Sequence, residues 1–548
     1  MKNKIKKIIQ IKQMKKKSLL LTFALFGIMP TFSNETEESD IQYEENIIVI
    51  EDSTTHNFNP HLTDLASDVQ ILSSVYEGLF SYNPSTLEPM YAIAINYNIS
   101  RDKKRWTFDI NPQAKFSNGE AITAEHVKSS WLTLLATPNA PYASLLDVIE
   151  GAASYRNGEG SEEDVGIYVL SELKLMVHLE KPASYLPKVL CHPSFAIVHE
   201  KQNVFSGPYV IEKEAVVTET CESESAKNNN QKTILKKNEY YWDAKNVLTK
   251  QFTFIQSDNP DENAHLYNNG DADWINASVS TQKIIDKKDC LIFPQYGTSY
   301  MFFKLKEGES ENIWSHIEFR QALFEAFPWE QFRFGYYVPA TTFVYPLAGY
   351  PTVDGFDFTD LMEAQKIMEN ARKKYNIPSW VKIPLNIDIS KGSFTSQQLL
   401  LLKSTCDSLG IDLKVKEYPV YKYFDIIPTS TADIFQLVWI GDFADPYAFL
   451  ELFRSDSTLN SANFKNADFD SLLDKATSAS ATESLNYYAQ AETLLLDNYI
   501  VFPLHHPVGV NVINTSVVSG WVLNAMDLHP LKYIYKKKQK YQFGKNVI

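Results

Sequence analysis

Asp433-Ile-Phe-Gln-Leu-Val-Trp-Ile-Gly-Asp-Phe-Ala-Asp-Pro446 is the stretch that decides the fold of this chain. Its segment Ile434–Ile440 is almost wholly apolar and rich in branched and aromatic side chains, which predicts a strand buried on both faces. The run stops at Gly441 and cannot continue past Pro446, because proline donates no backbone hydrogen bond. The carboxylate of Asp442 therefore follows directly on the carboxyl end of a buried strand, where open α/β sheets bind ligands. The alternative is a turn residue that bonds its own backbone.

The length and composition describe a multidomain globular protein. A chain of 548 residues is too long for one hydrophobic core, so two or three domains are expected. Hydrophobic residues make up 44% and charged residues 22%, which is ordinary for a soluble protein. The many aromatic residues suit apolar clefts as well as large cores.

The first 33 residues are expected to be a secretory signal peptide. Residues 1–17 carry eight Lys and no acidic residue, and residues 18–30 are apolar but too few to span a bilayer. Either Met1 or Met14 is the start. The first Cys is Cys191, so we expect a periplasmic protein that is exported without a lipid anchor.

The charge argues against nucleic acid and anionic membranes as partners. Loss of the eight signal Lys changes the net charge from −15 to about −23. The basic segment Lys536–Lys540 is interpreted as a solvated tail. The polar segment 218–232 is predicted to be a mobile surface insertion.

The remaining chain predicts an α/β protein. Short strands alternate with helices in the second half, which indicates a mostly parallel sheet with helices on its faces. The principal expected strands are 47–50, 105–110, 206–211, 385–389, 413–417 and 501–504, and the principal expected helices are 64–74, 319–330, 361–374, 397–409, 469–476 and 484–499.

Seven phrases, in order over nearly all of residues 46–535, resemble the solute-binding proteins of peptide/nickel-type ABC importers, the oligopeptide- and dipeptide-binding family. Each phrase alone is weak, but their order behind a signal peptide is specific. They are Val75-Tyr-Glu-Gly-Leu79, Phe116-Ser-Asn-Gly119 with Thr123-Ala-Glu-His-Val127, Gly207-Pro-Tyr209, Asn238…Tyr241-Trp242, Arg320-Gln-Ala-Leu323, Trp439-Ile-Gly-Asp-Phe-Ala-Asp-Pro446 and Phe469-Asp470…Leu473.

The resemblance implies a bilobal type II periplasmic-binding-protein-like fold with an additional inserted α+β module and a strand hinge. Lobe I would comprise residues 45–87, 205–303 and 501–545, and lobe II residues 304–500. The inserted module would be residues 88–204. The hinge strands would lie near Gly297–Phe303 and Ile500–Leu504.

The resemblance also implies an extracytoplasmic receptor that captures peptides between two closing lobes and delivers them to a membrane permease. A peptide would add a strand to exposed backbone on each side, which is β-augmentation. The matching backbone is Glu77-Gly78-Leu79 on one lobe and Val438-Trp439-Ile440 on the other, and Gly78 would allow close approach because it has no Cβ. The family's ammonium-binding acid corresponds to Asp442.

Four further residues have open roles. Tyr76 and Trp439 would form walls of the site or belong to the core, and Tyr300 is a candidate for a side-chain pocket. Asp445 rivals Asp442, although its place before Pro446 favours a turn role. Some oligopeptide receptors carry a basic residue shortly before the acid to hold the peptide carboxylate, but 435–438 are uncharged here, so the peptide length stays open.

Two other functions remain as alternatives. A nickel, other metal or haem receptor of the same fold is one, but only His505-His506 are adjacent, and strand neighbours point to opposite faces. An exported hydrolase is less expected, because no Gly-x-Ser-x-Gly or His-Glu-x-x-His motif is present. We therefore expect no enzyme, no cofactor, no resident metal and a monomer. The four Cys allow three pairings, and the sequence does not choose among them.

Overall fold

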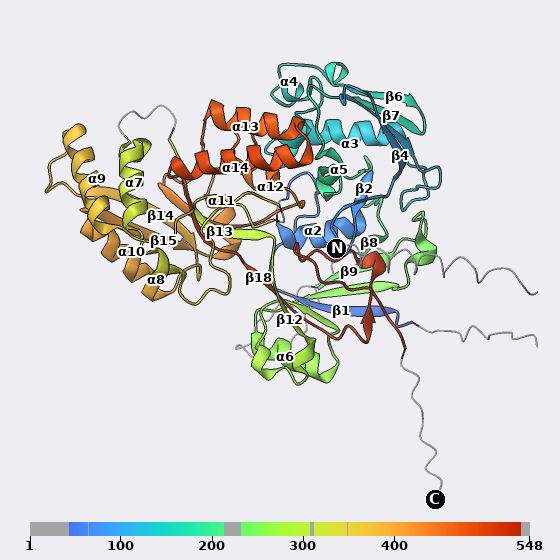
Figure 1. Ribbon diagram of the computed structural model, residues 1–548. Coiled ribbons are helices and arrows are strands. Elements are labelled where there is room, and N and C mark those ends of the chain that lie inside the picture. The colour runs from blue at the N-terminus through green and yellow to red at the C-terminus, as the bar shows by residue number, and fades with distance from the viewer. Residues whose placement is uncertain (1–42, 64, 213–231, 307–311, 348, 539–548) are drawn as a thin grey trace, which may run out of the picture. The chain divides into compact units, whose positions relative to one another are not determined.

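Two mixed β-sheets organise the part of the chain that the computed structural model describes, which is residues 43–63, 65–212, 232–306, 312–347 and 349–538 (Figure 1). The chain from Tyr43 onward forms one compact unit. The predicted signal peptide 1–33 and Cys221 lie outside the described residues, as does all but the last residue of the segment 218–232.

The first sheet is built around β1 (Asn46–Glu51), which confirms the strand predicted at 47–50. β1 runs parallel to both of its neighbours. Ile47 and Val49 pack with Leu72 of α2 (Ala66–Val75) on one face, as expected from the alternation of side chains along a strand. On the other face Ile50 packs with residues of α6 (Pro260–Asn269). Within the described residues its strand order is β12 (Cys290–Pro294), β18 (Val508–Ile513), β11 (Trp274–Asn276), β1, β10 (Gln251–Gln256), β9 (Lys232–Lys237) and β8 (Tyr209–Glu212).

The second sheet contains the apolar stretch Ile434–Ile440. The prediction of a mostly parallel sheet is only half right. β14 is parallel to β15 and β16, but β13 is antiparallel to β16 and β17. In the described chain the strand order is β15 (Ile411–Tyr418), β14 (Ile383–Ser390), β16 (Ile434–Ile440), β13 (Gly297–Phe303) and β17 (Val501–His505).

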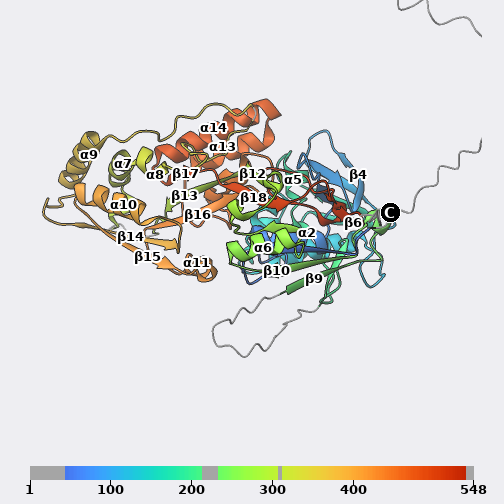
Figure 2. The ribbon, with the colours of Figure 1, turned by 90° about the horizontal axis from the view of Figure 1, so that it is seen from below.

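Helices cover the second sheet much as the sequence predicts. α9 (Leu361–Lys374) has the predicted bounds and contacts α7 (Ile317–Ala326), while α10 (Ser396–Ser408) contacts β15 (Figure 2). α13 (Ala467–Ser478) and α14 (Ala481–Asp497) lie side by side (Figure 1). The shorter helices of this part are α8 (Trp329–Arg333), α11 (Val420–Ile426) and α12 (Tyr447–Leu450).

The chain passes between the two sheets next to the two strands that were expected to form the hinge. β12 of the first sheet is followed after two residues by β13 of the second, and β17 of the second is followed after two residues by β18 of the first. Both segments named as hinge strands pair within the second sheet.

Residues 88–204, which we call the inserted segment, contain a separate antiparallel sheet. It has the order β4 (Ala94–Ile99), β5 (Arg105–Ile110), β7 (Lys174–His178) and β6 (Ile167–Ser171). Two small antiparallel pairs complete the described strands. They are β2 (Phe80–Tyr82) with β3 (Pro89–Tyr91), and β19 (Val518–Ser519) with β20 (Tyr535–Lys536). The helices of the inserted segment are α3 (Ala124–Ala136), α4 (Ala152–Arg156) and α5 (Leu186–Val189).

Two further observations bear on the sequence expectations. Cys191, Cys290 and Cys406 are free thiols. No described helix combines the length and the apolar character that crossing a membrane requires.

Candidate ligand-binding site

Strand β16 has the bounds that the sequence predicts, but it is buried on both faces only at its start. It pairs with β13 along its whole length, whereas β14 pairs only with Ile434 and Phe435. Its first three residues are buried, while Val438 is 49% exposed. The prediction of full burial is therefore wrong for 437–440, because the pairing with β14 stops at Phe435.

The second half of β16 presents an open main-chain edge. In an antiparallel ladder every second residue turns its N–H and C=O away from the partner strand. Gln436 does so here, since the Tyr423 hydroxyl accepts from its N–H at 3.0 Å and lies 2.8 Å from its C=O oxygen. Val438 and Ile440 share the direction of Gln436, on the side where β14 no longer pairs. Among the described residues no strand pairs with this edge.

Asp442 follows this edge and is surrounded by residues from distant parts of the chain. Its side chain is 15% exposed. The hydroxyl of Tyr142 donates to Oδ1 at 3.1 Å, and the hydroxyl of Tyr82 donates to the backbone oxygen at 2.8 Å. Nε2 of His192 lies 3.8 Å from Oδ1. Tyr82 belongs to β2, and the other two residues belong to the inserted segment, so Asp442 lies where these parts meet.

His192 turns a neutral donor towards Asp442. Its Nδ1 accepts the backbone N–H of Ser194 at 3.3 Å, which fits the tautomer with its proton on Nε2. Burial lowers the pKa of His192 to about 3, so the ring is uncharged at neutral pH. Its Nε2 is buried and has no hydrogen-bond partner within the described chain. The ring packs on Tyr142 with centroids 4.3 Å apart.

Asp445 makes the turn contact that the sequence favours, together with an ion pair. Its Oδ1 accepts the backbone N–H of Tyr447 at 3.1 Å, and Oδ2 lies 3.5 Å from Nζ of Lys188. Lys188 also donates to the backbone oxygen of Ala444 at 3.0 Å. Burial raises the pKa of Asp445. Asp445 thus connects the end of β16 to the inserted segment.

The carboxylate of Glu77 is buried and contacts three side chains of the protein. It accepts from the Tyr241 hydroxyl at 2.6 Å and from Nε1 of Trp242 at 2.7 Å, and Nζ of Lys532 lies 3.4 Å away. The side chains of Glu77 and Lys532 are 5% and 9% exposed. This ion pair joins the end of α2 to the last part of the described chain.

The backbone of Glu77-Gly78-Leu79 is largely bonded within the protein. The N–H of Glu77 donates to Ser206, and the C=O groups of all three residues accept bonds from the inserted segment. A Cβ at Gly78 would lie 2.7 Å from the backbone oxygen of Leu190. In this structure the chain itself therefore makes the close approach that glycine permits.

The three aromatic candidates differ in burial. Tyr76 is half-buried against Phe205, and Trp439 is half-buried with its indole N–H donating to Ala448 at 2.8 Å. Tyr300 is 3% exposed and packs on Phe343 in the core. Tyr300, the candidate for a side-chain pocket, thus lies in the core beneath the surface.

A small cavity of about 30 Å³ lies beside Glu77, in the segment between α2 and β2. Three of the residues singled out from the sequence, Tyr76, Glu77 and Gly78, line it. Tyr82 and Lys532 also line it. Because Tyr82 bonds to Asp442, the cavity lies next to the carboxylate site.

The adjacent histidines pack at the crossing between the sheets. His505 stacks on Tyr336 with centroids 3.8 Å apart, and Nδ1 of His506 bonds to the backbone oxygen of Gly297 at 2.8 Å. The described residues contain no group of three or more His, Cys, Asp or Glu that is arranged to hold a metal ion.

Comparison with known proteins gives the family. The dipeptide-binding protein DppE of Bacillus subtilis is 24% identical over 542 residues, covering 94% of this chain and 96% of its own length. The structure of the Escherichia coli murein tripeptide binding protein MppA superposes with a TM-score of 0.77 at 20% identity, covering 91% of this chain and 100% of its own. Haemophilus influenzae OppA in complex with RPPGFSPFR gives 0.76 at 19% identity, covering 91% and 100%.

The fold is therefore the type II periplasmic-binding-protein fold of these neighbours. A model of a known family, described as "Bacterial extracellular solute-binding proteins, family 5 Middle", matches residues 88–461, more than half of the chain. The family consists of solute-binding receptors. This chain belongs to the bacterial extracellular solute-binding proteins of family 5.

Proposed function

We propose that this protein is an extracytoplasmic receptor that captures peptides and delivers them to the permease of an ABC importer. The observation that carries the proposal is Asp442 at the end of a strand whose main-chain edge is open. The relatives' names support it, since DppE is a dipeptide-binding protein and the OppA structure contains a nonapeptide.

The open edge of β16 would hold the peptide backbone. The N–H and C=O groups of Val438 and Ile440 are available to an added strand, as β-augmentation requires. The α-ammonium would bind Asp442, where a charge-assisted bond in a dry site is worth roughly 1.5–3 kcal/mol. The hydroxyl of Tyr142 would hold the carboxylate in place, with the uncharged ring of His192 beside it.

The opposite wall would be formed by residues that line the cavity beside Glu77. Tyr76, Glu77 and Gly78 line it, and Trp439 would extend the wall on the side of β16. Leu79 and Tyr300 would support the site from the core, where both are buried. Lobe I (45–87, 205–303, 501–545) with the inserted module (88–204) would close on lobe II (304–500), and closure would follow from contacts that the peptide makes with both sides.

The cellular location and the oligomeric state belong to the same proposal. The protein would be exported by its signal peptide 1–33 and act as a periplasmic monomer that is not a lipoprotein. Its acidic charge is consistent with peptide rather than nucleic acid as the partner.

Calorimetry with Asp442→Ala and a free-amine peptide tests this function. We expect binding to weaken at least tenfold, because removal of one partner of a buried charged pair costs about 2–5 kcal/mol. N-acetylation of the peptide should have the same effect on the wild-type protein. The matched control is Asp412→Ala, which removes an exposed carboxylate from β15 of the same sheet and should leave affinity unchanged.

Two results would contradict the proposal. One is unchanged affinity of Asp442→Ala for the free-amine peptide, and the other is equal binding of free and acetylated peptide. Incubation with a peptide mixture separates the alternatives, since a receptor returns peptides intact, a hydrolase returns fragments, and a metal receptor responds to ions. Mass spectrometry of ligand carried through purification would identify the peptide class.

A further inference from the structure

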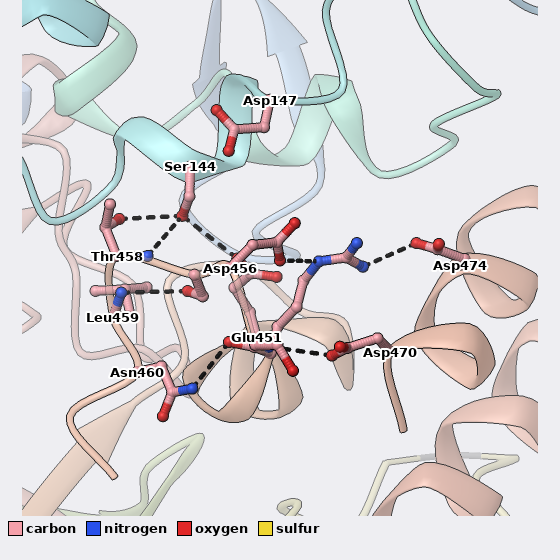
Figure 3. Close-up of polar contacts among 12 residues, drawn as sticks. Ser144, Asp147, Glu451, Asp456, Thr458, Leu459, Asn460, Asp470 and Asp474 are labelled. Atoms are coloured by element: carbon pink, nitrogen blue, oxygen red, sulfur yellow. Dashed lines mark hydrogen bonds and ion pairs between the residues drawn. The ribbon is translucent and has the colours of Figure 1, made fainter. Parts of the chain in front are cut away.

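The inserted segment contacts the region after β16 at a second place, outside the proposed peptide site. On one side lies the 3-10 turn Ala143–Leu146, and on the other lies the segment 451–474 (Figure 3). None of the residues that we assign to the peptide site takes part in these contacts.

A cluster of hydroxyl groups forms the first point of contact. Oγ of Ser144 lies 3.0 Å from Oγ1 of Thr458 and accepts the backbone N–H of Thr458 at 3.2 Å. Oγ1 of Thr458 in turn donates to the backbone oxygen of Pro141 at 2.5 Å. Figure 3 shows Ser144 placed between Thr458 and Glu451, whose Oε1 lies 3.4 Å from Oγ of Ser144.

One lysine forms the second point of contact. Nζ of Lys181, on the inserted segment, pairs with Oδ1 of Asp474 on α13. The same carboxylate accepts from Nη1 of Arg454 at 2.8 Å, and Nε of Arg454 pairs with Asp456 at 2.6 Å. Asp474 therefore has one partner across the contact and one on its own side.

The distribution of charges suits a contact that separates and reforms. On the inserted segment Asp147 is paired with Arg156, and on the facing segment Asp474 is paired with Arg454. Separation would leave no carboxylate of these pairs without its own cation. Lys181 is already 32% exposed, so it exchanges Asp474 for water at little cost.

Glu451 differs from Asp147 and Asp474, because its carboxylate has no cation within hydrogen-bond distance among the described residues. It is 2% exposed, and its Oε2 has no hydrogen-bond partner in the described chain. Burial raises the pKa of Glu451 to about 7. The titratable groups that face it are Tyr447, Arg454 and Asp456 of its own segment, Tyr185 and Arg156 of the inserted segment, and Tyr488 of α14.

We propose that Ser144 and Lys181, together with Glu451, Thr458 and Asp474, form a latch that holds the two sides of the site together without touching the ligand. The proposal rests on the proposed function only in taking these sides to open and close. Because Ser144 of the inserted segment contacts Glu451, separation would expose this carboxylate to water and lower its raised pKa. The latched state would then bind a proton that the open state releases. Acid therefore favours the latched state, and this preference is lost as pH rises through about 7.

Hydrogen exchange of one amide tests the latch in the full chain without any peptide. The N–H of Thr458 donates across the contact to Ser144, so its protection reports the latched fraction directly. In Lys181→Ala we expect this amide to exchange about threefold faster, as befits the loss of a partly exposed ion pair. The matched control is Lys174→Ala, which breaks the ion pair with Asp109 inside the inserted segment's own sheet and should leave Thr458 unchanged.

Glu451→Gln tests the proton dependence. In the wild type, exchange of the Thr458 amide, corrected for its intrinsic rate, should accelerate at least about fivefold from pH 5.5 to pH 8. In Glu451→Gln the acceleration should be below about twofold. The matched control is Glu492→Gln, since Glu492 is also buried and burial raises its pKa to about 7, but its bonds to Phe343, Val344 and Tyr350 stay on one side of the contact.

A salt titration repeats the test without any substitution. At 1 M KCl the wild-type Thr458 amide should exchange about threefold faster, and Lys181→Ala should show no further acceleration. The latch is refuted if Lys181→Ala exchanges like the wild type, if Lys174→Ala accelerates equally, or if Glu451→Gln keeps the full pH dependence. Since no peptide is present, these outcomes do not depend on the calorimetry of Asp442→Ala.

Discussion

The two sides of the candidate site use charge in opposite ways. On the side of α2, the carboxylates of Glu77 and Asp68 are paired with basic side chains of the protein itself. Glu77 pairs with Lys532 at the end of the helix, and Asp68 pairs with His56 near its start. On the side of β16, the backbone edge is open at Val438 and Ile440, and the Asp442 carboxylate accepts from the neutral hydroxyl of Tyr142. In the proposed function, the first side would supply a rigid wall and the second side would supply the bonds to a peptide.

We expect the largest effect on stability from the removal of Glu77, the buried acid on the side of α2. Glu77→Ala leaves Lys532 buried without its carboxylate, so the free energy of unfolding should fall by about 3–5 kcal/mol. Urea denaturation measures this change. Glu77→Leu combined with Lys532→Met removes both charges and should recover most of the loss. A double variant as unstable as the single one would show that the pair matters for its shape and not for its charge.

The sequence predicts the β16 side better than the α2 side, for a physical reason. The bounds of β16 and the place of Asp442 follow from a local pattern, an apolar run that stops at glycine. The burial of Glu77 depends on Lys532, which is 455 residues away, and no local pattern encodes that contact. Tyr142 and His192 were missed for the same reason, since packing brings them to Asp442 across 300 and 250 residues of chain.

A second, smaller effect concerns the start of α2. His56 lies 2.8 Å from Asp68 and 3.0 Å from Glu51. Burial by itself would lower the pKa of His56, but the hydrogen bonds to Asp68 and Glu51 outweigh it and raise the pKa to about 9. The folded pKa is above the unfolded value, so this contribution is complete below about pH 6.5 and is lost as pH rises through about 9.

The loss should not exceed about 3 kcal/mol in the free energy of unfolding between pH 6.5 and pH 9.5. Denaturation at a series of pH values measures it. His56→Gln should flatten the profile in this range, while peptide affinity at pH 7 should be unchanged. A profile that is equally steep in His56→Gln would assign the alkaline loss to other groups.

The smallest effect sharpens the claim about the open edge. Val438→Pro removes an N–H that faces away from β13, and proline is tolerated where its missing donor would face an edge. Peptide binding should weaken by about 1 kcal/mol, the net worth of one hydrogen bond, with little change in stability. Leu437→Pro is the matched control, because that N–H faces β13, so proline there removes a ladder hydrogen bond and should reduce stability more than Val438→Pro does.

Comparing the two proline variants shows which backbone N–H groups of β16 face the ligand. If adjacent positions on one strand separate cleanly, with affinity lost at Val438 and stability lost at Leu437, then the alternation set by Gln436 and Tyr423 continues to the end of β16. If Val438→Pro destabilises the protein as much as Leu437→Pro, the N–H of Val438 already has a partner within the fold. The edge would then be closed to a peptide, and both sides of the site would serve as walls.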